Sequence, residues 1–172
     1  MASSASRLAG SSSTIRIGPV GFWDYMTVTS WEESPDGGGR CEMLKTGAVV
    51  RGEGVFEVVA TGPETRFQPS VEQLAELHGR SPLDGVVVAS PANPTGTMLL
   101  PEELAAIARW CEERGVQLVS DEIYHGIQYA GARASCAWET SREAVVFGSF
   151  SKYFSMTGWR LGWMLAPERL RR

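Results

Sequence analysis

Long apolar runs, cysteine, histidine and excess basic charge are all scarce in this sequence of 172 residues. The longest apolar runs, such as residues 86–89 and 144–147, are far too short to span a membrane, so we expect a soluble protein with no membrane partner. Acidic side chains exceed basic ones to give a net charge of -4, and no basic stripe is present to bind a phosphate backbone. We therefore expect no nucleic-acid partner.

The few cysteines and histidines do not form a recognisable site. Cys41, Cys111 and Cys136 are widely spaced and contain no Cys-x-x-Cys pair, which predicts neither a disulfide framework nor a zinc cluster. His78 and His125 have no metal-ligand spacing around them, so no metal is expected. Free thiols favour a reducing compartment, and we expect a cytoplasmic protein.

The N-terminal third is rich in small and polar residues. Residues 1–23 contain six serines, Arg7 and Arg16 and no acid, a composition similar to that of an organelle transit peptide. A clear amphipathic arginine face is missing, so a poorly ordered leader is the main expectation and an organelle location the alternative. Together with a loop rich in glycine at residues 34–39, this predicts a leader segment over residues 1–50.

Capping signals and apolar runs predict alternating strands and helices after residue 51. Ser70 and Gln73 match a capping box at the start of a short amphipathic helix. The nearly continuous apolar run at residues 85–90 predicts a strand buried on both faces. Pro101 suits the first position of the next helix, which Gly115 can end.

Three further strands complete a predicted α/β sheet. Residues 116–120 follow the helix, so strand, helix and strand make a right-handed crossover in a parallel sheet. Residues 144–150 form a third buried strand, and the link to a fourth at residues 160–166 is too short for a crossover helix. The sheet is therefore expected to be mainly parallel with one antiparallel strand. Asp121 lies at the carboxyl end of the second strand, where open α/β sheets bind ligands.

A lysine placed just past an apolar strand, with hydroxyls before it and an arginine after it, can hold an amine beside a phosphate site. Lys152 has this setting, with Ser149 before it and Arg160 after it. Pyridoxal phosphate offers an aldehyde to an amine, a phosphate to hydroxyls and a guanidinium, and a ring nitrogen to a carboxylate. Asp121 is the candidate carboxylate.

Four motifs occur in order along the second half of the chain. They are Asn93-Pro94-Thr95-Gly96, Asp121-Glu122-Ile123-Tyr124, Ser149-Phe150-Ser151-Lys152 and Gly158-Trp159-Arg160-Leu161-Gly162. These motifs resemble the cofactor motifs of the class I/II, fold type I, pyridoxal-phosphate-dependent aminotransferases, over about residues 62–172. The resemblance implies that residues 51–172 are part of the large, cofactor-binding domain and that residues 1–50 are a leader or a non-homologous segment.

The resemblance also implies an activity and a cofactor. The enzyme would transfer an amino group between an amino acid and a 2-oxo acid with pyridoxal 5'-phosphate. A full-length member of the family would be a homodimer, which is not expected of a partial chain. Residues 167–172 read as the beginning of a helix at which the sequence stops, as expected of a partial chain.

By the same resemblance, three residues would be catalytic. Lys152 would bind the cofactor aldehyde covalently and later move a proton, and Asp121 would pair with the pyridine nitrogen. Tyr124, together with Asn93, would hydrogen-bond the phenolic oxygen of the ring. The implied cofactor-binding residues are Asn93, Asp121, Tyr124, Ser149, Lys152 and Arg160, of which Ser149 and Arg160 would hold the phosphate.

The same residues are compatible with other functions. A related fold type I enzyme, either a carbon-sulfur lyase or an aminocyclopropane-carboxylate-synthase-like enzyme, would use the same cofactor residues. A truncated relative would keep the cofactor edge without turnover and act only as a binding protein. Asp121 can also simply cap the segment after its strand, and Ser149 can satisfy a local backbone group.

The pattern Ser149-x-x-Lys152 also occurs in serine β-lactamases, but here the segment Lys45-Thr46-Gly47 precedes it, whereas that family places it afterwards. The sequence does not identify the aromatic ring that would stack on the cofactor or the arginine that would bind the substrate carboxylate. It does not specify the amino acid substrate either.

Overall fold

The computed structural model describes residues 10–17, 20–35, 38–46, 51–129 and 131–170. The chain forms two compact units, Met1–Ala60 and Thr61–Arg172. In the described residues the first unit consists of β-strands, and the second combines strands with helices.

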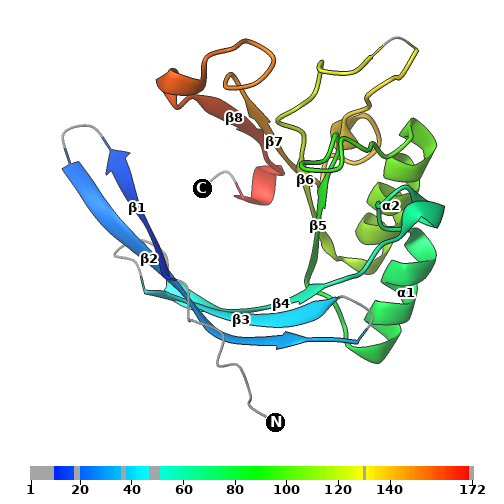
Figure 1. Cartoon of the computed structure of the whole chain (residues 1–172), viewed down its shortest axis with the longest axis horizontal. Helices are drawn as coiled ribbons and strands as arrows, with labels where there is room; N and C mark the ends of the chain where they lie inside the picture. Colours follow the sequence, from blue (N-terminus) through cyan, green and yellow to red (C-terminus); the bar gives the residue numbers. More distant parts are fainter. Residues whose placement is uncertain (1–9, 18–19, 36–37, 47–50, 130, 171–172) are drawn as a thin grey trace. The chain divides into compact units, whose positions relative to one another are not determined.

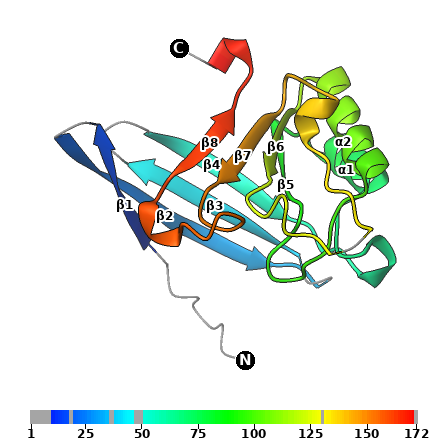
Figure 2. The ribbon, with the colours of Figure 1, turned by 90° about the horizontal axis from the view of Figure 1, so that it is seen from above.

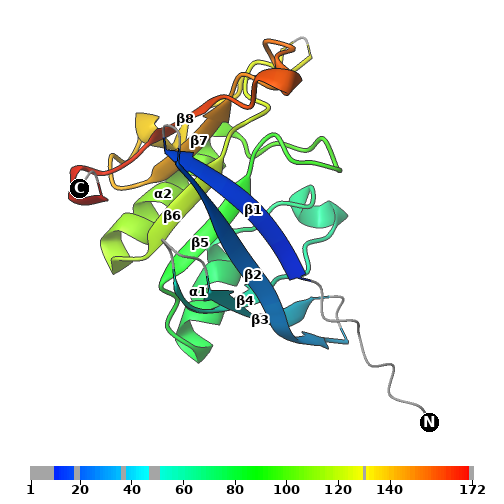
Figure 3. The same ribbon diagram turned by 90° about the vertical axis from the view of Figure 1, so that its left-hand side faces the viewer.

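Four antiparallel strands form a meander in the first unit. They are β1 (Gly10–Ile17), β2 (Val20–Glu33), β3 (Gly39–Thr46) and β4 (Arg51–Val58), paired in the order β1-β2-β3-β4. Figure 3 shows β1 and β2 lying side by side along their length, as their pairing requires. The strand predicted at residues 55–60 overlaps β4.

Each of the other strands of this meander pairs with the next strand along the chain. Trp31 pairs with Cys41, and Glu42 pairs with Val55. The sequence analysis did not predict β1, β2 and β3, because residues 10–46 show no clear alternation of apolar and polar side chains. Residues 1–9, 18–19, 36–37 and 47–50 of the expected leader lie outside the described residues, and the boundary after residue 50 stays a prediction.

The second unit contains the predicted α/β sheet. Its strands are β5 (Gly85–Ala89), β6 (Gln117–Asp121), β7 (Val145–Ser149) and β8 (Gly162–Leu165), in the order β5-β6-β7-β8. The first three are parallel, and β8 is antiparallel to β7, with Ser149 opposite Gly162. The predicted fold class and the antiparallel pair are therefore confirmed. Figure 2 shows the strands following one another across the sheet.

Two helices belong to this unit, α1 (Val71–Arg80) and α2 (Pro101–Arg114). The short 3-10 helices are Pro63–Thr65, Ala137–Glu139, Thr157–Trp159 and Glu168–Leu170. The predicted capping box is present, because Ser70 Oγ accepts from Gln73 N at 3.3 Å and Gln73 Oε1 accepts from Ser70 N at 3.0 Å. Gly115 ends α2 at φ 66, a left-handed conformation that favours glycine.

Both helices lie on the same side of the sheet in Figure 1. The core joins that face of the strands to the helices and contains Leu74, Val86, Val88, Leu104, Ile107, Leu118 and Val146. Leu104 and Ile107 of α2 are each 1% exposed, so this interface is closely packed.

The opposite face of the sheet is open in the described chain. Val87 is 67% exposed, and Phe147 and its cross-strand partner Met164 are also exposed. The prediction of a strand at residues 85–90 buried on both faces was therefore wrong, whereas the predicted third strand is mostly buried and is exposed only at Phe147. Side chains alternate between the two faces of a strand, and α1 and α2 cover only one of them.

Candidate active site

The candidate residues lie at the carboxyl edge of the parallel strands. β5, β6 and β7 run in the same direction and end at Ala89, Asp121 and Ser149. The loops that follow these strands emerge at the same end of the sheet (Figure 1). A parallel sheet thereby brings together side chains that are far apart in the sequence.

Asn93, Tyr124 and Lys152 come together at this edge. The amide Nδ2 of Asn93 donates to the hydroxyl of Tyr124 at 3.3 Å. Lys152 Nζ lies 5.2 Å from the centroid of the Tyr124 ring, a distance at which an ammonium group is attracted to the aromatic face. Lys152 and Tyr124 are half-buried and Asn93 is exposed. Three loops thus contribute an amide, a phenol and an amine to one place.

Asp121 is half-buried and makes a local contact. Its Oδ1 accepts a hydrogen bond from Ile123 N at 3.2 Å, which is the capping contact expected of an aspartate after a strand. The carboxylate therefore fixes the backbone that leads to Tyr124. Its pairing with a ring nitrogen stays a prediction.

The side chains of Ser149 and Arg160 make hydrogen bonds to backbone groups of the β7–β8 connection. Ser149 Oγ accepts from Ser151 N at 3.0 Å and lies 3.5 Å from Leu161 O. Arg160 adopts φ 53, and its Nη1 donates to Thr157 O at 3.1 Å. The arginine is exposed and has further N–H donors that this bond does not use. The two residues flank one connection, and their role as phosphate ligands stays a prediction.

Glu122 has a structural role that the sequence analysis did not identify. The side chain is 4% exposed, and its Oε1 accepts from Ser120 Oγ at 2.9 Å and from Ala137 N at 2.8 Å. It thereby joins the end of β6 to the segment that begins the Ala137–Glu139 helix. The polar Ser120 inside an apolar strand, two residues before an acid, is the only sequence signal for this contact.

Two of the three thiols, the buried Cys111 and the half-buried Cys136, are not suited to act as nucleophiles. Burial raises the pKa of Cys111 to about 11. Burial, and then the negative charge of Glu122, raise the pKa of Cys136 to about 12. Since the thiolate is the reactive form, both thiols are unreactive at neutral pH. Cys41, the remaining cysteine, is also free of disulfide bonds.

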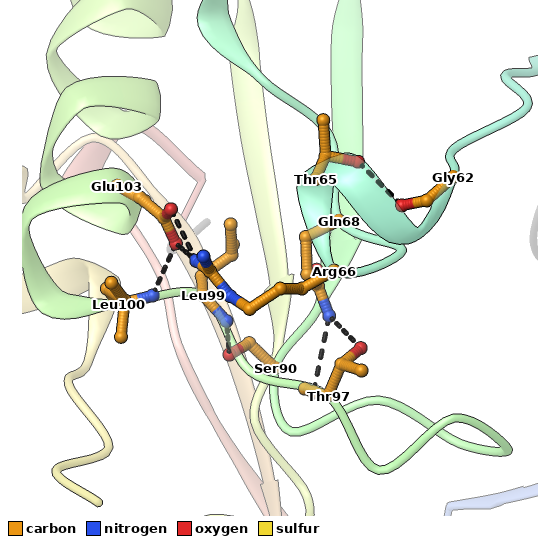
Figure 4. Close-up of polar contacts among 9 residues, drawn as sticks. All are labelled: Gly62, Thr65, Arg66, Gln68, Ser90, Thr97, Leu99, Leu100 and Glu103. Carbon is orange, nitrogen blue, oxygen red and sulfur yellow. Dashed lines mark hydrogen bonds and ion pairs between the residues drawn. The ribbon is translucent and has the colours of Figure 1, made fainter.

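The turn before α1, which carries Arg66 and Gln68, contacts the loop of Asn93 and α2, although it lies outside the four sequence motifs. Figure 4 shows Arg66 reaching Glu103 of α2, while Gln68 points toward Thr97. Arg66 donates to both carboxylate oxygens of Glu103, whose Oε2 also accepts from Leu100 N at 2.7 Å. Glu103 therefore supplies the cap that Leu100 lacks, and it ties α2 to the turn.

We expect this ion pair to make stability depend on pH. Partial burial raises the pKa of Glu103, but the hydrogen bonds from Arg66 and from the Leu100 N–H outweigh it and hold this pKa below its usual value. A lowered folded-state pKa stabilises the protein above the pKa of the unfolded chain, and the contribution is lost as the pH falls through the folded value. Glu103→Gln should therefore weaken folding at neutral pH and reduce the loss of stability below about pH 5.

Because Glu103 is more than a third exposed, the expected change is about 1 kcal/mol or less. Urea unfolding at a series of pH values measures it. Glu102→Gln removes a neighbouring charge from the same turn of α2 and leaves the pair with Arg66 in place. An unchanged acid slope in Glu103→Gln would contradict this account.

The described part of the chain contains neither a cluster of metal ligands nor a membrane-spanning helix. Among these residues, no group of three or more His, Cys, Asp or Glu side chains is placed to hold a metal ion. None of the helices described is long and apolar enough to cross a membrane.

The sequence and the fold of this chain match a known class of enzymes. The sequence model for aminotransferase class I and II matches residues 43–172, so the chain belongs to the class I and II aminotransferase family. The match begins within β3 and reaches into residues 43–50, which lie in the expected leader.

Among individual relatives, the chain is 64% identical over 115 residues to the valine–pyruvate aminotransferase of Mycobacterium tuberculosis, covering 66% of this chain and 29% of that protein. It is 39% identical over 119 residues to a probable aspartate/prephenate aminotransferase of Aquifex aeolicus, covering 67% of this chain and 30% of that protein.

Solved structures of aminotransferases also resemble this chain. A crystal structure of an aminotransferase from Mycobacterium tuberculosis matches with a TM-score of 0.64 and 64% identity, over 66% of this chain and 29% of that chain. Aspartate aminotransferase from Thermus thermophilus with maleate matches with a TM-score of 0.57 and 36% identity, over 63% of this chain and 28% of that chain. The chain thus spans about three tenths of the length of these relatives.

Proposed function

We propose that this chain is the cofactor-binding part of an enzyme that transfers an amino group between an amino acid and a 2-oxo acid with pyridoxal 5'-phosphate. The observation that carries the proposal is the meeting of Asn93, Tyr124 and Lys152 at the carboxyl edge of the sheet. Membership of the class I and II aminotransferase family supports it.

The residues present fit this cofactor. The amine of Lys152, the phenol of Tyr124 and the amide of Asn93 lie together. The carboxylate of Asp121 and the hydroxyl of Ser149 lie at the ends of the neighbouring strands β6 and β7, and the guanidinium of Arg160 lies in the connection between β7 and β8. When bound, pyridoxal phosphate supplies a reactive aldehyde and an electron-withdrawing ring. Each of these protein groups complements one polar group of that molecule.

Each residue has a distinct task in this proposal. Lys152 holds the cofactor and moves the proton at the substrate α-carbon, and Asp121 accepts a hydrogen bond from the protonated ring nitrogen. Asn93 and Tyr124 bind the phenolic oxygen. The phosphate is held by Ser149, and by the free N–H donors of Arg160.

Valine and pyruvate are the proposed first pair of substrates, because the relative that is 64% identical is named for them. The matched part covers 29% of that relative, so the remaining parts of the substrate site lie outside the comparison. We further propose a cytoplasmic location, which the free thiols support, and a homodimer for the full-length enzyme.

The test loads the chain with pyridoxal phosphate and then adds valine, with and without pyruvate. Transamination should yield the 2-oxo acid of valine and should produce alanine only when pyruvate is present. Lys152→Ala should remove both products. A separate assay with an amino acid that carries a thiol leaving group on its β-carbon, such as cysteine, tests the lyase alternative, because elimination would release sulfide and ammonia without pyruvate. An absence of all products from valine would reject amino-group transfer from valine by this chain.

A further inference from the structure

We propose that Gln68 is a positioning residue for Asn93. Its buried side-chain amide fixes both ends of the turn at residues 90–97, and this turn carries Asn93 to Tyr124. The inference rests on the proposed function, in which Asn93 contacts the cofactor. Gln68 lies outside the four cofactor motifs.

The side chain of Gln68 is 3% exposed and bonds to the two ends of this turn. Its Nε2 lies 3.3 Å from Ala89 O, at the end of β5, and 3.3 Å from Thr97 O. The same nitrogen lies 3.1 Å from Thr97 Oγ1 (Figure 4). One amide group therefore connects the residue that precedes the turn to the residue that closes it.

The turn is closed by the same carbonyl that Gln68 binds. Thr97 O accepts from Ala92 N at 2.9 Å, and Ala92 O accepts from Gly96 N at 2.8 Å. Asn93 lies between these bonds and is itself exposed, as are the residues that follow it up to Gly96. Because these exposed residues do not pack into the core, the base of the turn determines where the Asn93 side chain lies.

The segment that carries Gln68 is itself firmly held. Phe67 N donates to Gly62 O at 2.9 Å, and Gln68 N donates to Thr65 O at 3.1 Å. Arg66 and Phe67 both adopt left-handed backbone angles, φ 55 and 58, which are unfavourable for such side chains. The ion pair between Arg66 and Glu103 connects this turn to α2. Gln68 thus offers its amide from a fixed position.

On the opposite side of the turn, Ser90 completes the support. Its hydroxyl accepts from Leu99 N at 2.9 Å, and its own N–H donates to Asp121 O at 3.1 Å. The Ser90 contacts connect the turn to the neighbouring strand. They do not reach Thr97, so Gln68 is the residue that ties Thr97 to the end of β5.

The first experiment needs no cofactor. Gln68→Met keeps a similar volume but removes the amide donors, so the turn should open more often. Amide hydrogen exchange at Ala92 and Gly96 should become about tenfold faster, while amides within α2 should exchange at their original rates. Gln73→Met is the matched control, since Gln73 binds only the Ser70 cap among its described contacts, and it should leave Ala92 and Gly96 unchanged.

The second experiment uses the chain loaded with pyridoxal phosphate. The pH midpoint of the visible absorbance of the bound cofactor reports on the contact between Asn93 and the ring. Gln68→Met and Asn93→Ala should shift this midpoint in the same direction, and the double variant should shift it no further than Asn93→Ala alone. A role in stability alone would lower the unfolding midpoint and leave the absorbance midpoint where it is.

The outcomes separate the two proposals. Failure of pyridoxal phosphate to bind at Lys152 rejects the proposed function, while hydrogen exchange still decides whether Gln68 holds the turn. Unchanged exchange at Ala92 and Gly96 in Gln68→Met overturns the positioning role, as does an additive midpoint shift in the double variant.

If Gln68→Met does not fold, Gln68→Leu provides a second apolar substitution. If neither folds, the side-chain NH2 of Gln68 in the unsubstituted chain decides the question. Exchange of these protons as slow as that of the Ala92 amide supports the proposal, and exchange at the rate of free glutamine overturns it.

Discussion

Addition of pyridoxal phosphate followed by borohydride reduction should leave the label on Lys152, and Lys152→Ala should abolish it. The chain contains only one other lysine, Lys45, so peptide mapping distinguishes the two sites. Lys152 lies beside Tyr124, whose hydroxyl binds Asn93, and these groups can orient the cofactor against the amine. Such proximity should make labelling of Lys152 exceed that of Lys45 by about tenfold or more.

Lys45→Ala is the matched control and should leave the labelling of Lys152 unchanged. Separate detection of the N-terminal peptide accounts for the α-amino group. Equal labelling of both lysines in the unsubstituted chain would mean that only ordinary amine reactivity is present, and the proposed cofactor site would have to be abandoned.

Replacement of Glu122 by alanine should produce the largest loss of stability among substitutions near the site. The buried carboxylate accepts from Ser120 Oγ and Ala137 N, and both of these residues are fully buried. Without the carboxylate, two buried donors lose their partner, so Glu122→Ala should lower the free energy of unfolding by about 3 kcal/mol. Urea unfolding followed by tryptophan fluorescence measures this change.

Two further variants test the physical reason. Glu122→Gln keeps an acceptor oxygen and should lower stability by only about 1 kcal/mol. Glu113→Ala removes a carboxylate that is 69% exposed, and its effect should stay within about 0.5 kcal/mol. If Glu122→Ala and Glu113→Ala were equally stable, the hydrogen bonds of Glu122 would not hold the segment after β6 in place.

The central part of the fold could be predicted because its signals are local. The capping box at Ser70, the position of Pro101 and the glycine after α2 define the helices. The short link between β7 and β8 requires an antiparallel pair. By contrast, the strands of the first unit show no sustained alternation of apolar and polar residues, so only part of β4 was predicted there.

The part of the site that could be predicted is the part that the parallel strands bring to one edge of the sheet. Asn93, Tyr124 and Lys152 come together because they follow the ends of neighbouring parallel strands or lie in the loops after them. The contacts of Gln68 and Glu122 could not be predicted, because each depends on where another segment packs. The side chains proposed to contact the cofactor lie in motifs, whereas those that support them are recognisable only in three dimensions.

The open sheet face has a consequence for laboratory work with this chain. Val87, Phe147 and Met164 are exposed side chains on β5, β7 and β8. Exposed apolar surface promotes contact between copies of a protein, and salts such as sulfate strengthen that tendency. We therefore expect dilution and salt composition to influence whether an assay observes single molecules or associated ones, so variants should be compared at one concentration in one buffer.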